Sequence, residues 1–285
     1  MCIRDRYFQG MEKMKFITLI NGSVKVLFLI LIFIFIKSPK DYYFVPLFHG
    51  AAAFIGGIIG LYIIIFKDNI SLKIQPVYRL KYYIKNSFSI FLSNIVLSVK
   101  DRFSIIIIGA TLGMREVAIF DLGIKIMNIF MQVITIANNA VFPKVSREKN
   151  LQFVKRFAKY SFLASIILVI IIQPFLNNIL NFLSNNLEGT LIVCRILLLS
   201  TIILSLSVVI SRNYLVAFGY FKYFFYSVII TTIFYVVFIG VAYAFSLLEY
   251  VITFAWITVL TYLVELIYRL KIYSKLSKTE IMNDR

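Results

Sequence analysis

Residues 117–142 read VAIFDLGIKIMNIFMQVITIANNAVF, an apolar run long enough to cross a membrane that is nevertheless polar along one side. Its polar stripe consists of Asp121, Lys125, Asn128, Gln132, Thr135 and Asn139. On a helix these residues fall within an arc of roughly 80° and extend over about 27 Å. Lipid satisfies none of these groups, so this side must face water, a polar substrate or partner helices. The polar stripe favours a transporter over a simple membrane anchor.

Composition supports a protein with several membrane spans. The chain has 285 residues, of which 61% are hydrophobic and only 15% are charged. A soluble domain of this length cannot hide so much apolar surface. Two cysteines and a single histidine, His49, argue against a disulfide framework and against a metal site. We expect no cofactor.

Hydropathy and helix breakers predict eight membrane helices. Their expected ranges are 16–36, 43–66, 87–109, 117–142, 160–182, 190–211, 223–246 and 250–270. Most of the 30 basic residues fall in alternate loops, whereas the opposite loops carry only Lys37, Lys40 and Arg115. The positive-inside rule therefore places both termini in the cytoplasm. The net charge of +17 reports this topology, and we expect no nucleic-acid partner.

The loops leave little room for a catalytic domain. Every loop on the expected outer side is short, and the longer inner segments 67–86 and 143–159 mix lysines with apolar residues at helical spacing. These segments are typical of amphipathic helices at the membrane surface. They divide the chain into a pair of helices followed by a bundle of six. Residues 1–6 are polar and lack a signal-peptide core, so we interpret 1–10 as a leader that is foreign to the rest.

The charges within the spans are biased toward the positive. The basic residues are Lys25, Lys100, Arg102, Lys125 and Arg195, and the acids are Asp101, Asp121 and Glu265. A cavity with this bias suits a phosphate or diphosphate. Residues 100–102 cover about 200° of helix surface, so the three cannot all face one cavity. We choose Asp101 and Arg102 for the polar side, with Asn94 and Ser98, in preference to Lys100.

Several of these residues also have structural interpretations. Asp121 and Lys125 are four apart and could simply neutralise each other, and Arg195 could reach the outer interface. Glu265 and Arg269 have the spacing of a structural ion pair. Pro174 predicts a kink near the outer end of the fifth helix.

Five short segments of the sequence form a series with a distinctive order and spacing. They are YFQGMEKM (residues 7–14), SVKDRF (98–103) followed by Gly109 and Leu112-Gly113, VAIFD (117–121), FPK (142–144) and AFGYFK (217–222). Together they resemble the sequence pattern of one family of membrane proteins, the Wzx-type polysaccharide flippases, and the resemblance covers about residues 7–275.

The resemblance implies an all-α polytopic fold, that of the multidrug/oligosaccharidyl-lipid/polysaccharide exporters, with two six-helix lobes around a central cavity. Family members carry about four further spans before this point. The resemblance therefore divides the chain into residues 11–66 (last two helices of the first lobe), 67–86 (cytoplasmic linker), 87–271 (complete second lobe) and 272–285 (cytoplasmic tail).

The resemblance also implies a function. The substrate would be an undecaprenyl-diphosphate-linked oligosaccharide, flipped across the bacterial inner membrane for surface polysaccharide synthesis, with a polysaccharide polymerase and chain-length proteins as partners alongside membrane lipids. Phosphate would be held by Lys25, Arg102, Lys125 and Arg195, and the sugar path would be lined by Asn94, Ser98, Asn128, Gln132, Thr135 and Asn139. Asp101 and Asp121 are candidates for ion coupling.

Other functions fit the sequence less well. A cation-coupled drug exporter of the same superfamily would favour an acidic cavity. A membrane enzyme, such as a polysaccharide polymerase or glycosyltransferase, would need a long extramembrane loop with catalytic residues. A pure scaffold would gain nothing from six polar residues in register across a bilayer. We therefore expect a transporter rather than an enzyme.

Overall fold

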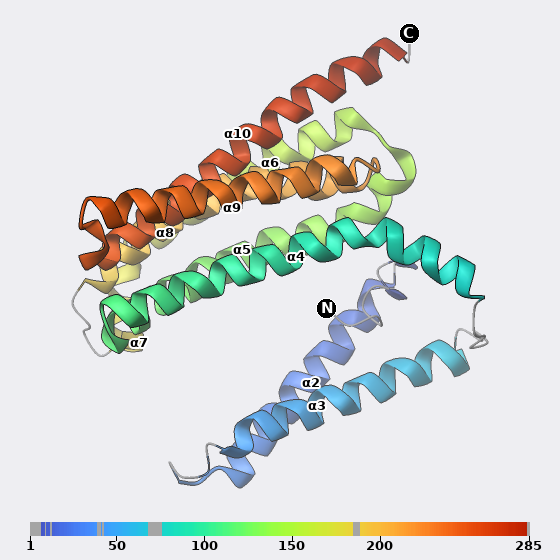
Figure 1. Ribbon diagram of the computed structural model, residues 1–285. Helices are drawn as coiled ribbons and strands as arrows, with labels where there is room; N and C mark the ends of the chain where they lie inside the picture. The colour runs from blue at the N-terminus through green and yellow to red at the C-terminus, as the bar shows by residue number, and fades with distance from the viewer. Residues whose placement is uncertain are drawn as a thin grey trace. The chain divides into compact units, whose positions relative to one another are not determined.

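The structure, a computed structural model, describes residues 7–8, 10–11, 13–38, 41, 43–67, 76–184 and 189–283. Much of the expected leader and residues 68–75 of the expected linker lie outside this range. The chain divides into two compact units, Met1–Leu80 and Lys81–Arg285. Every regular element in the described ranges is helical (Figure 1). The expectation of an all-α polytopic protein is confirmed.

The first unit is a pair of packed helices. They are α2 (Met14–Phe35) and α3 (Phe44–Tyr62), and α3 continues into the π-helical segment η2 (Ile63–Lys67). Gly56 and Gly60 are buried on α3, in keeping with close helix packing through small residues. Both helices expose long apolar side chains over most of their surface, as membrane helices do.

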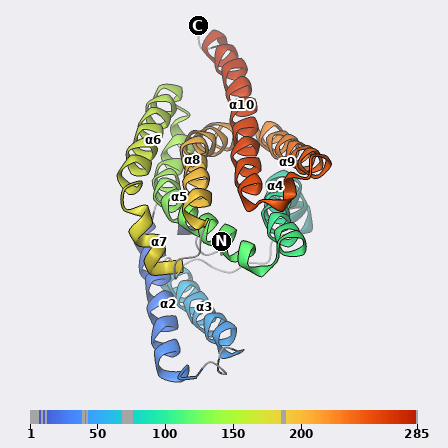
Figure 2. The same ribbon diagram turned by 90° about the vertical axis from the view of Figure 1, so that its left-hand side faces the viewer.

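The second unit holds the remaining helices. They are α4 (Val77–Thr111, which begins just before the division), α5 (Met114–Glu148), α6 (Leu151–Ile172), α7 (Leu176–Ser184), α8 (Thr190–Val209), η3 (Ile210–Val216), α9 (Phe221–Ala244), η4 (Leu247–Glu249) and α10 (Val251–Asn283). Helix α8 lies at the centre, with α5 and α6 on one side and α10 on the other (Figure 2). Helix α9 packs against α10.

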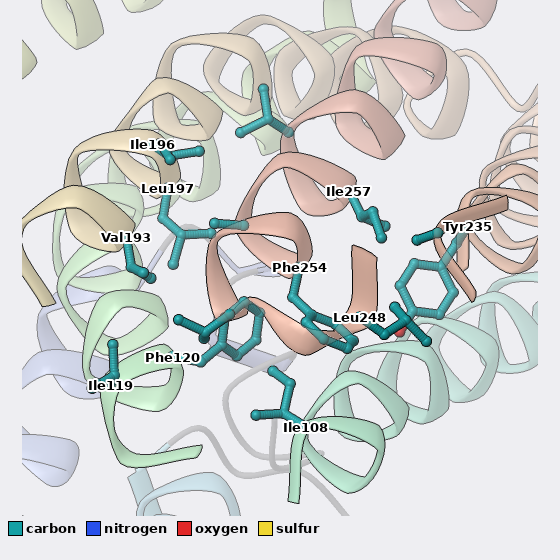
Figure 3. Packing of buried hydrophobic residues seen from close by; sticks show 14 residues of the cluster. Ile108, Ile119, Phe120, Val193, Ile196, Leu197, Tyr235, Leu248, Phe254 and Ile257 are labelled. Atoms are coloured by element: carbon teal, nitrogen blue, oxygen red, sulfur yellow. The ribbon is translucent and has the colours of Figure 1, made fainter. Parts of the chain in front are cut away.

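A hydrophobic core at one end of this bundle joins five helices. Ile108 of α4, Phe120 of α5, Leu197 of α8, Tyr235 of α9 and Phe254 of α10 are all buried in it. Figure 3 shows their side chains converging between the helices. This core fixes the relative positions of α4, α5, α9 and α10, the four helices that line the site described below.

Several helices are longer than hydropathy predicts. Helix α4 starts at Val77 instead of 87, and α5 continues past Pro143 to Glu148. Helix α6 starts at Leu151 instead of 160, and α10 reaches Asn283 instead of 270. The extensions carry charged residues, which end an apolar window without ending a helix. The kink expected at Pro174 is confirmed, because α6 and α7 meet there at 68°.

Six described helices are long and apolar enough to cross a membrane, or seven if the bent pair of α6 and α7 forms one span. The chain is thus a multi-pass membrane protein. Helix α4, the third of the eight expected spans, is not among these helices, and Lys100, Asp101 and Arg102 stand within its length.

Candidate functional site: a charged pocket between four helices

A cavity of about 430 Å³ lies among α4, α5, α9 and α10 in the second unit. Helix α4 contributes the run from Ser98 to Ile105, and α5 contributes residues between Phe120 and Asn128. Tyr235 comes from α9, and α10 supplies two threonines and Tyr262. Three basic and two acidic side chains line this pocket, so it carries a formal charge of about +1 at neutral pH.

The turn between α4 and α5 brings the two charged walls together. Gly113 has φ of +93°, a value that suits glycine because it has no Cβ. Its N–H donates to the carbonyl of Ile108 at 3.2 Å, which closes the end of α4. The chain then reverses at once into α5. Charged residues about ten positions from the turn on each helix therefore meet in one cavity.

On the α5 wall, the Asp121–Lys125 ion pair is formed. The Lys125 Nζ lies 2.7 Å from Asp121 Oδ2, yet the lysine side chain keeps 69% of its surface exposed. Pairing therefore leaves the ammonium accessible within the pocket, with donors to spare for an anionic ligand. Local neutralisation and ligand binding are compatible at this position.

On the α4 wall, the expectation that Lys100, Asp101 and Arg102 cannot all face one cavity is wrong. The Lys100 side chain is buried, its Nζ is 4.6 Å from the centre of the Tyr262 ring, and Asp101 Oδ1 is 3.6 Å away. Lys100, Asp101 and Arg102 all line the pocket. The helical-wheel argument failed because the pocket extends from α5 to α10 around α4, so consecutive residues reach different walls of the same cavity.

A hydrogen bond ties α4 to α9 at the edge of the pocket. The hydroxyls of Ser104 and Tyr235 are 2.7 Å apart and both residues are buried. On the α10 side, Thr258 and Thr261 line the cavity and donate to carbonyls of their own helix at 2.8 and 2.6 Å. The pocket thus combines charged groups with hydroxyls on a fixed helical frame.

The structure brings together only part of the predicted site. Of the predicted residues, the pocket is lined by Ser98, Asp101, Arg102, Asp121, Lys125 and Asn128. The rest of the polar stripe continues along α5 beyond it, with Gln132 exposed and Thr135 and Asn139 half-buried.

The other predicted residues lie elsewhere. Asn94 is exposed on α4, and Arg195 is exposed on α8 together with Ile192 and Leu199, away from the pocket. Lys25 is exposed on α2 in the first unit. A phosphate role for Arg195 in this pocket is therefore not supported by its position.

Sequence reasoning missed the residues from α9 and α10. A signal was present on α10, where Thr258, Tyr262, Glu265 and Arg269 are spaced by 4, 3 and 4 residues, the same periodicity as the polar stripe. Tyr235 gave no such signal, because it stands among apolar residues of α9 and only the fold places it beside Ser104.

The Glu265–Arg269 pair lies deeper in the bundle and is a structural ion pair, as its spacing indicates. Both side chains are almost fully buried. Arg269 also donates to the Ser207 hydroxyl on α8 at 2.8 Å and to the Ser227 hydroxyl on α9 at 3.2 Å, and Ser207 donates to Glu265 at 3.2 Å. This network joins α8, α9 and α10. Among the described residues, no group of three or more His, Cys, Asp or Glu side chains could hold a metal ion.

Comparison with known proteins identifies the family. The model of the family described as "Polysaccharide biosynthesis protein" matches residues 1–149, just over half of the chain. The chain belongs to this family. The family match covers α4 and α5, and with them most of the charged pocket.

Two curated relatives carry the name "Putative O-antigen transporter". The protein from Shigella dysenteriae is 30% identical over 157 residues, which are 54% of this chain and 39% of that protein. The protein from Escherichia coli K12 is 26% identical over 148 residues, which are 52% of this chain and 36% of that protein. The matched segment thus spans well under half the length of either relative. No solved structure matches the chain.

Proposed function

We propose that this chain is part of a flippase that moves undecaprenyl-diphosphate-linked oligosaccharide units across the bacterial inner membrane. The transporter would alternate between inward-open and outward-open states to supply surface polysaccharide synthesis. The observation that carries the proposal is the pocket of the second unit, with three cationic side chains and two carboxylates beside a row of hydroxyls. The family and the names of its relatives support the same class of substrate.

In this proposal the diphosphate binds between α4 and α5. Arg102 presents a planar fork of donors that fits two phosphate oxygens, and Lys125 adds a mobile ammonium. Lys100 contributes positive charge from the α10 side, where Asp101 and the ring of Tyr262 hold it. Lys25 remains a prediction for the first unit, whereas Arg195 is left out because it is exposed away from the pocket.

The sugar path would begin at Ser98 and Asn128 in the pocket and follow the polar stripe along α5. Hydroxyl and amide groups exchange hydrogen bonds with sugar hydroxyls at little cost, because both sides donate and accept. Asp101 and Asp121 would couple transport to an ion by gaining and losing a cation or proton as their lysine partners engage phosphate. The proposal also places the C-terminus in the cytoplasm, with a polysaccharide polymerase and chain-length proteins as partners.

The deciding experiment measures binding of a short isoprenyl diphosphate to the purified chain in lipid nanodiscs. Wild type should bind farnesyl diphosphate at least about tenfold more tightly than farnesol, since each charge-assisted contact contributes roughly 1.5–3 kcal/mol. The double variant Arg102→Gln with Lys125→Gln should lose most of this preference. The matched control Arg156→Gln with Lys222→Gln removes the same charge from exposed positions outside the pocket and should retain it.

Equal affinity for diphosphate and alcohol would refute the proposal. A preference for the lipophilic cation tetraphenylphosphonium would instead indicate a drug exporter. Translocation of a labelled undecaprenyl-diphosphate sugar in proteoliposomes, with the same variants, then tests transport itself.

A further inference from the structure

A second cavity lies among α6, α8 and α10 and shares no residue with the charged pocket. Its volume is about 260 Å³, and it is bounded by the first half of α6, by Leu206 and Ile210 where α8 passes into η3, and by Leu270 and Tyr273 of α10. We call it the α6 groove. It lies near the end of the bundle that carries the α5–α6 turn, the end that the positive-inside rule assigns to the cytoplasm.

The α6 wall of this groove changes character along its length. Lys155, Ala158, Lys159 and Phe162 line it, and their spacing puts them on one face of the helix. The two lysines occupy the first turns of α6, whereas Phe162 lies further along the helix axis, about 10 Å from Lys155 and about 4.5 Å from Lys159. The groove therefore offers ammonium groups at its mouth and an apolar floor that runs toward the middle of the membrane.

Both lysines are exposed. Neither makes a hydrogen bond or an ion pair with any residue that the structure describes. The described residues that line the groove include no acidic side chain. The acid closest to the α5–α6 turn, Glu148, lies 3.8 Å from Arg147 in an ion pair of its own. Counting the described side chains alone, the mouth of the groove thus carries a charge of about +2 that no acid in its lining offsets.

The start of α6 is held firmly, so the lysines project from a fixed frame. The Asn150 side chain caps the helix by accepting from the Phe153 N–H at 3.0 Å. Lys144 of α5 places its Nζ 4.9 Å from the centre of the Phe153 ring. Below them, Val154 is buried in a core with Tyr214, which stacks edge-on against Tyr273 at 4.8 Å.

We propose that the α6 groove is a binding site for an anionic phospholipid of the surrounding bilayer. The headgroup phosphate would contact Lys155 and Lys159, and one acyl chain would lie along Phe162 and Leu270. Charge complementarity selects an anionic lipid over a zwitterionic one, because no carboxylate in the lining can pair with a headgroup amine. A free phosphate ion would contact the lysines but would bury no apolar surface on the floor of the groove. The acyl chain therefore distinguishes a bound phospholipid from a bound phosphate ion.

The test uses the purified full chain in detergent and native mass spectrometry of lipid adducts. The probes are phosphatidylglycerol and phosphatidylethanolamine with identical acyl chains, each with and without inorganic phosphate. Wild type should bind phosphatidylglycerol about tenfold more tightly than phosphatidylethanolamine, because both carry a phosphate but only phosphatidylethanolamine adds an ammonium that the two lysines repel. Excess inorganic phosphate should displace little of the lipid.

Four variants locate the site. Lys155→Gln with Lys159→Gln should abolish the preference for phosphatidylglycerol, whereas Lys155→Arg with Lys159→Arg should retain it. Arg156→Gln with Lys222→Gln, which removes equal charge outside the groove, should leave it unchanged. Ala158→Leu adds bulk to the groove without changing charge and should weaken both lipids alike, with thermal melting confirming that the fold is intact.

The proposal fails if wild type shows no preference between the two lipids. It also fails if the control pair loses the preference as fully as the lysine pair, which would indicate only a diffuse surface charge. Full displacement by inorganic phosphate would show that the lysines bind free anions and that the groove holds no lipid. None of these outcomes depends on the diphosphate pocket.

Discussion

Removing Arg269 should destabilise the second unit more than almost any other single change. Its side chain is 3% exposed and that of its partner Glu265 is 4% exposed. Water therefore cannot solvate either charge when the other is removed. Arg269→Met leaves Glu265 buried without its counter-ion. Breaking a buried pair in this way costs about 3–5 kcal/mol. The donations to Ser207 and Ser227 are lost as well, at roughly 0.6 kcal/mol each for hydrogen bonds within membranes.

The assay is unfolding of the purified chain by SDS in mixed micelles, followed by circular dichroism. Arg147→Met provides the matched control, because its pair with Glu148 spans 3.8 Å and its side chain is 67% exposed. An exposed pair of this kind contributes only about 0–1 kcal/mol. We therefore expect a loss of free energy of unfolding several times larger for Arg269→Met than for Arg147→Met.

A double variant separates a lost interaction from a stranded charge. Replacing Glu265 by Leu together with Arg269→Met removes both charges and fills the space with apolar atoms. Such replacements are often neutral or stabilising by about 1–4 kcal/mol, so the double variant should recover most of the loss. If Arg269→Met costs no more than Arg147→Met, or if the double variant is as unstable as the single one, the argument from buried charge is wrong.

Three further changes have defined outcomes. Gly123→Ala should cost about 1–3 kcal/mol of unfolding free energy in the same SDS assay, because its new Cβ would lie 2.7 Å from the buried Leu197 Cδ1. The control Gly240→Ala meets no atom within 4 Å and should be neutral or slightly stabilising. Equal effects of the two changes would contradict the packing argument. Lys125→Ala should weaken farnesyl diphosphate binding about fivefold and reduce glycan export from cells. The stability of the chain should change little, because the ion pair of Lys125 is mostly exposed. Unchanged binding would show that Lys125 does not contact the diphosphate. Asp41 accepts hydrogen bonds from the backbone N–H groups of Ser38 and Lys37, above all from Ser38, and this lowers the pKa of Asp41 in the folded chain. The stabilisation from these hydrogen bonds should therefore be present above the unfolded pKa near 3.8 and be lost as pH falls through the lower folded value. Carboxyl NMR titration checks this, and a midpoint at or above the ordinary value would contradict it.

Hydropathy located the helices well because each span must satisfy its backbone internally and present apolar side chains to lipid. It misjudged where the helices end, because this requirement applies only within the bilayer. Helix α5 passes Pro143 without stopping, and α10 continues as far as Asn283. Beyond the bilayer a helix needs no apolar residues, so the pattern that marks a span says nothing about where the helix itself ends.

The candidate site shows a different limit. Asp121, Lys125 and Asn128 were predictable because one helix imposes their common face, and the structure places all three in the pocket. Lys100 and Tyr235 were not, because each meets a residue far away in sequence: Lys100 lies over Tyr262 of α10, and Tyr235 of α9 meets Ser104 of α4. Periodicity describes a face of one helix, whereas a pocket also depends on which helices meet that face.

Helix α4 has a consequence for how the protein enters the membrane. On the scale of translocon insertion, each charge near the centre of a span costs about 2.5–3.5 kcal/mol, whereas each isoleucine or phenylalanine returns only about 0.3–0.6 kcal/mol. The consecutive charges Lys100, Asp101 and Arg102 therefore outweigh the isoleucines that follow them. We expect α4 to stay in the translocon until α5 emerges behind the tight turn at Gly113, so that the two leave together as a hairpin with Lys125 already paired to Asp121.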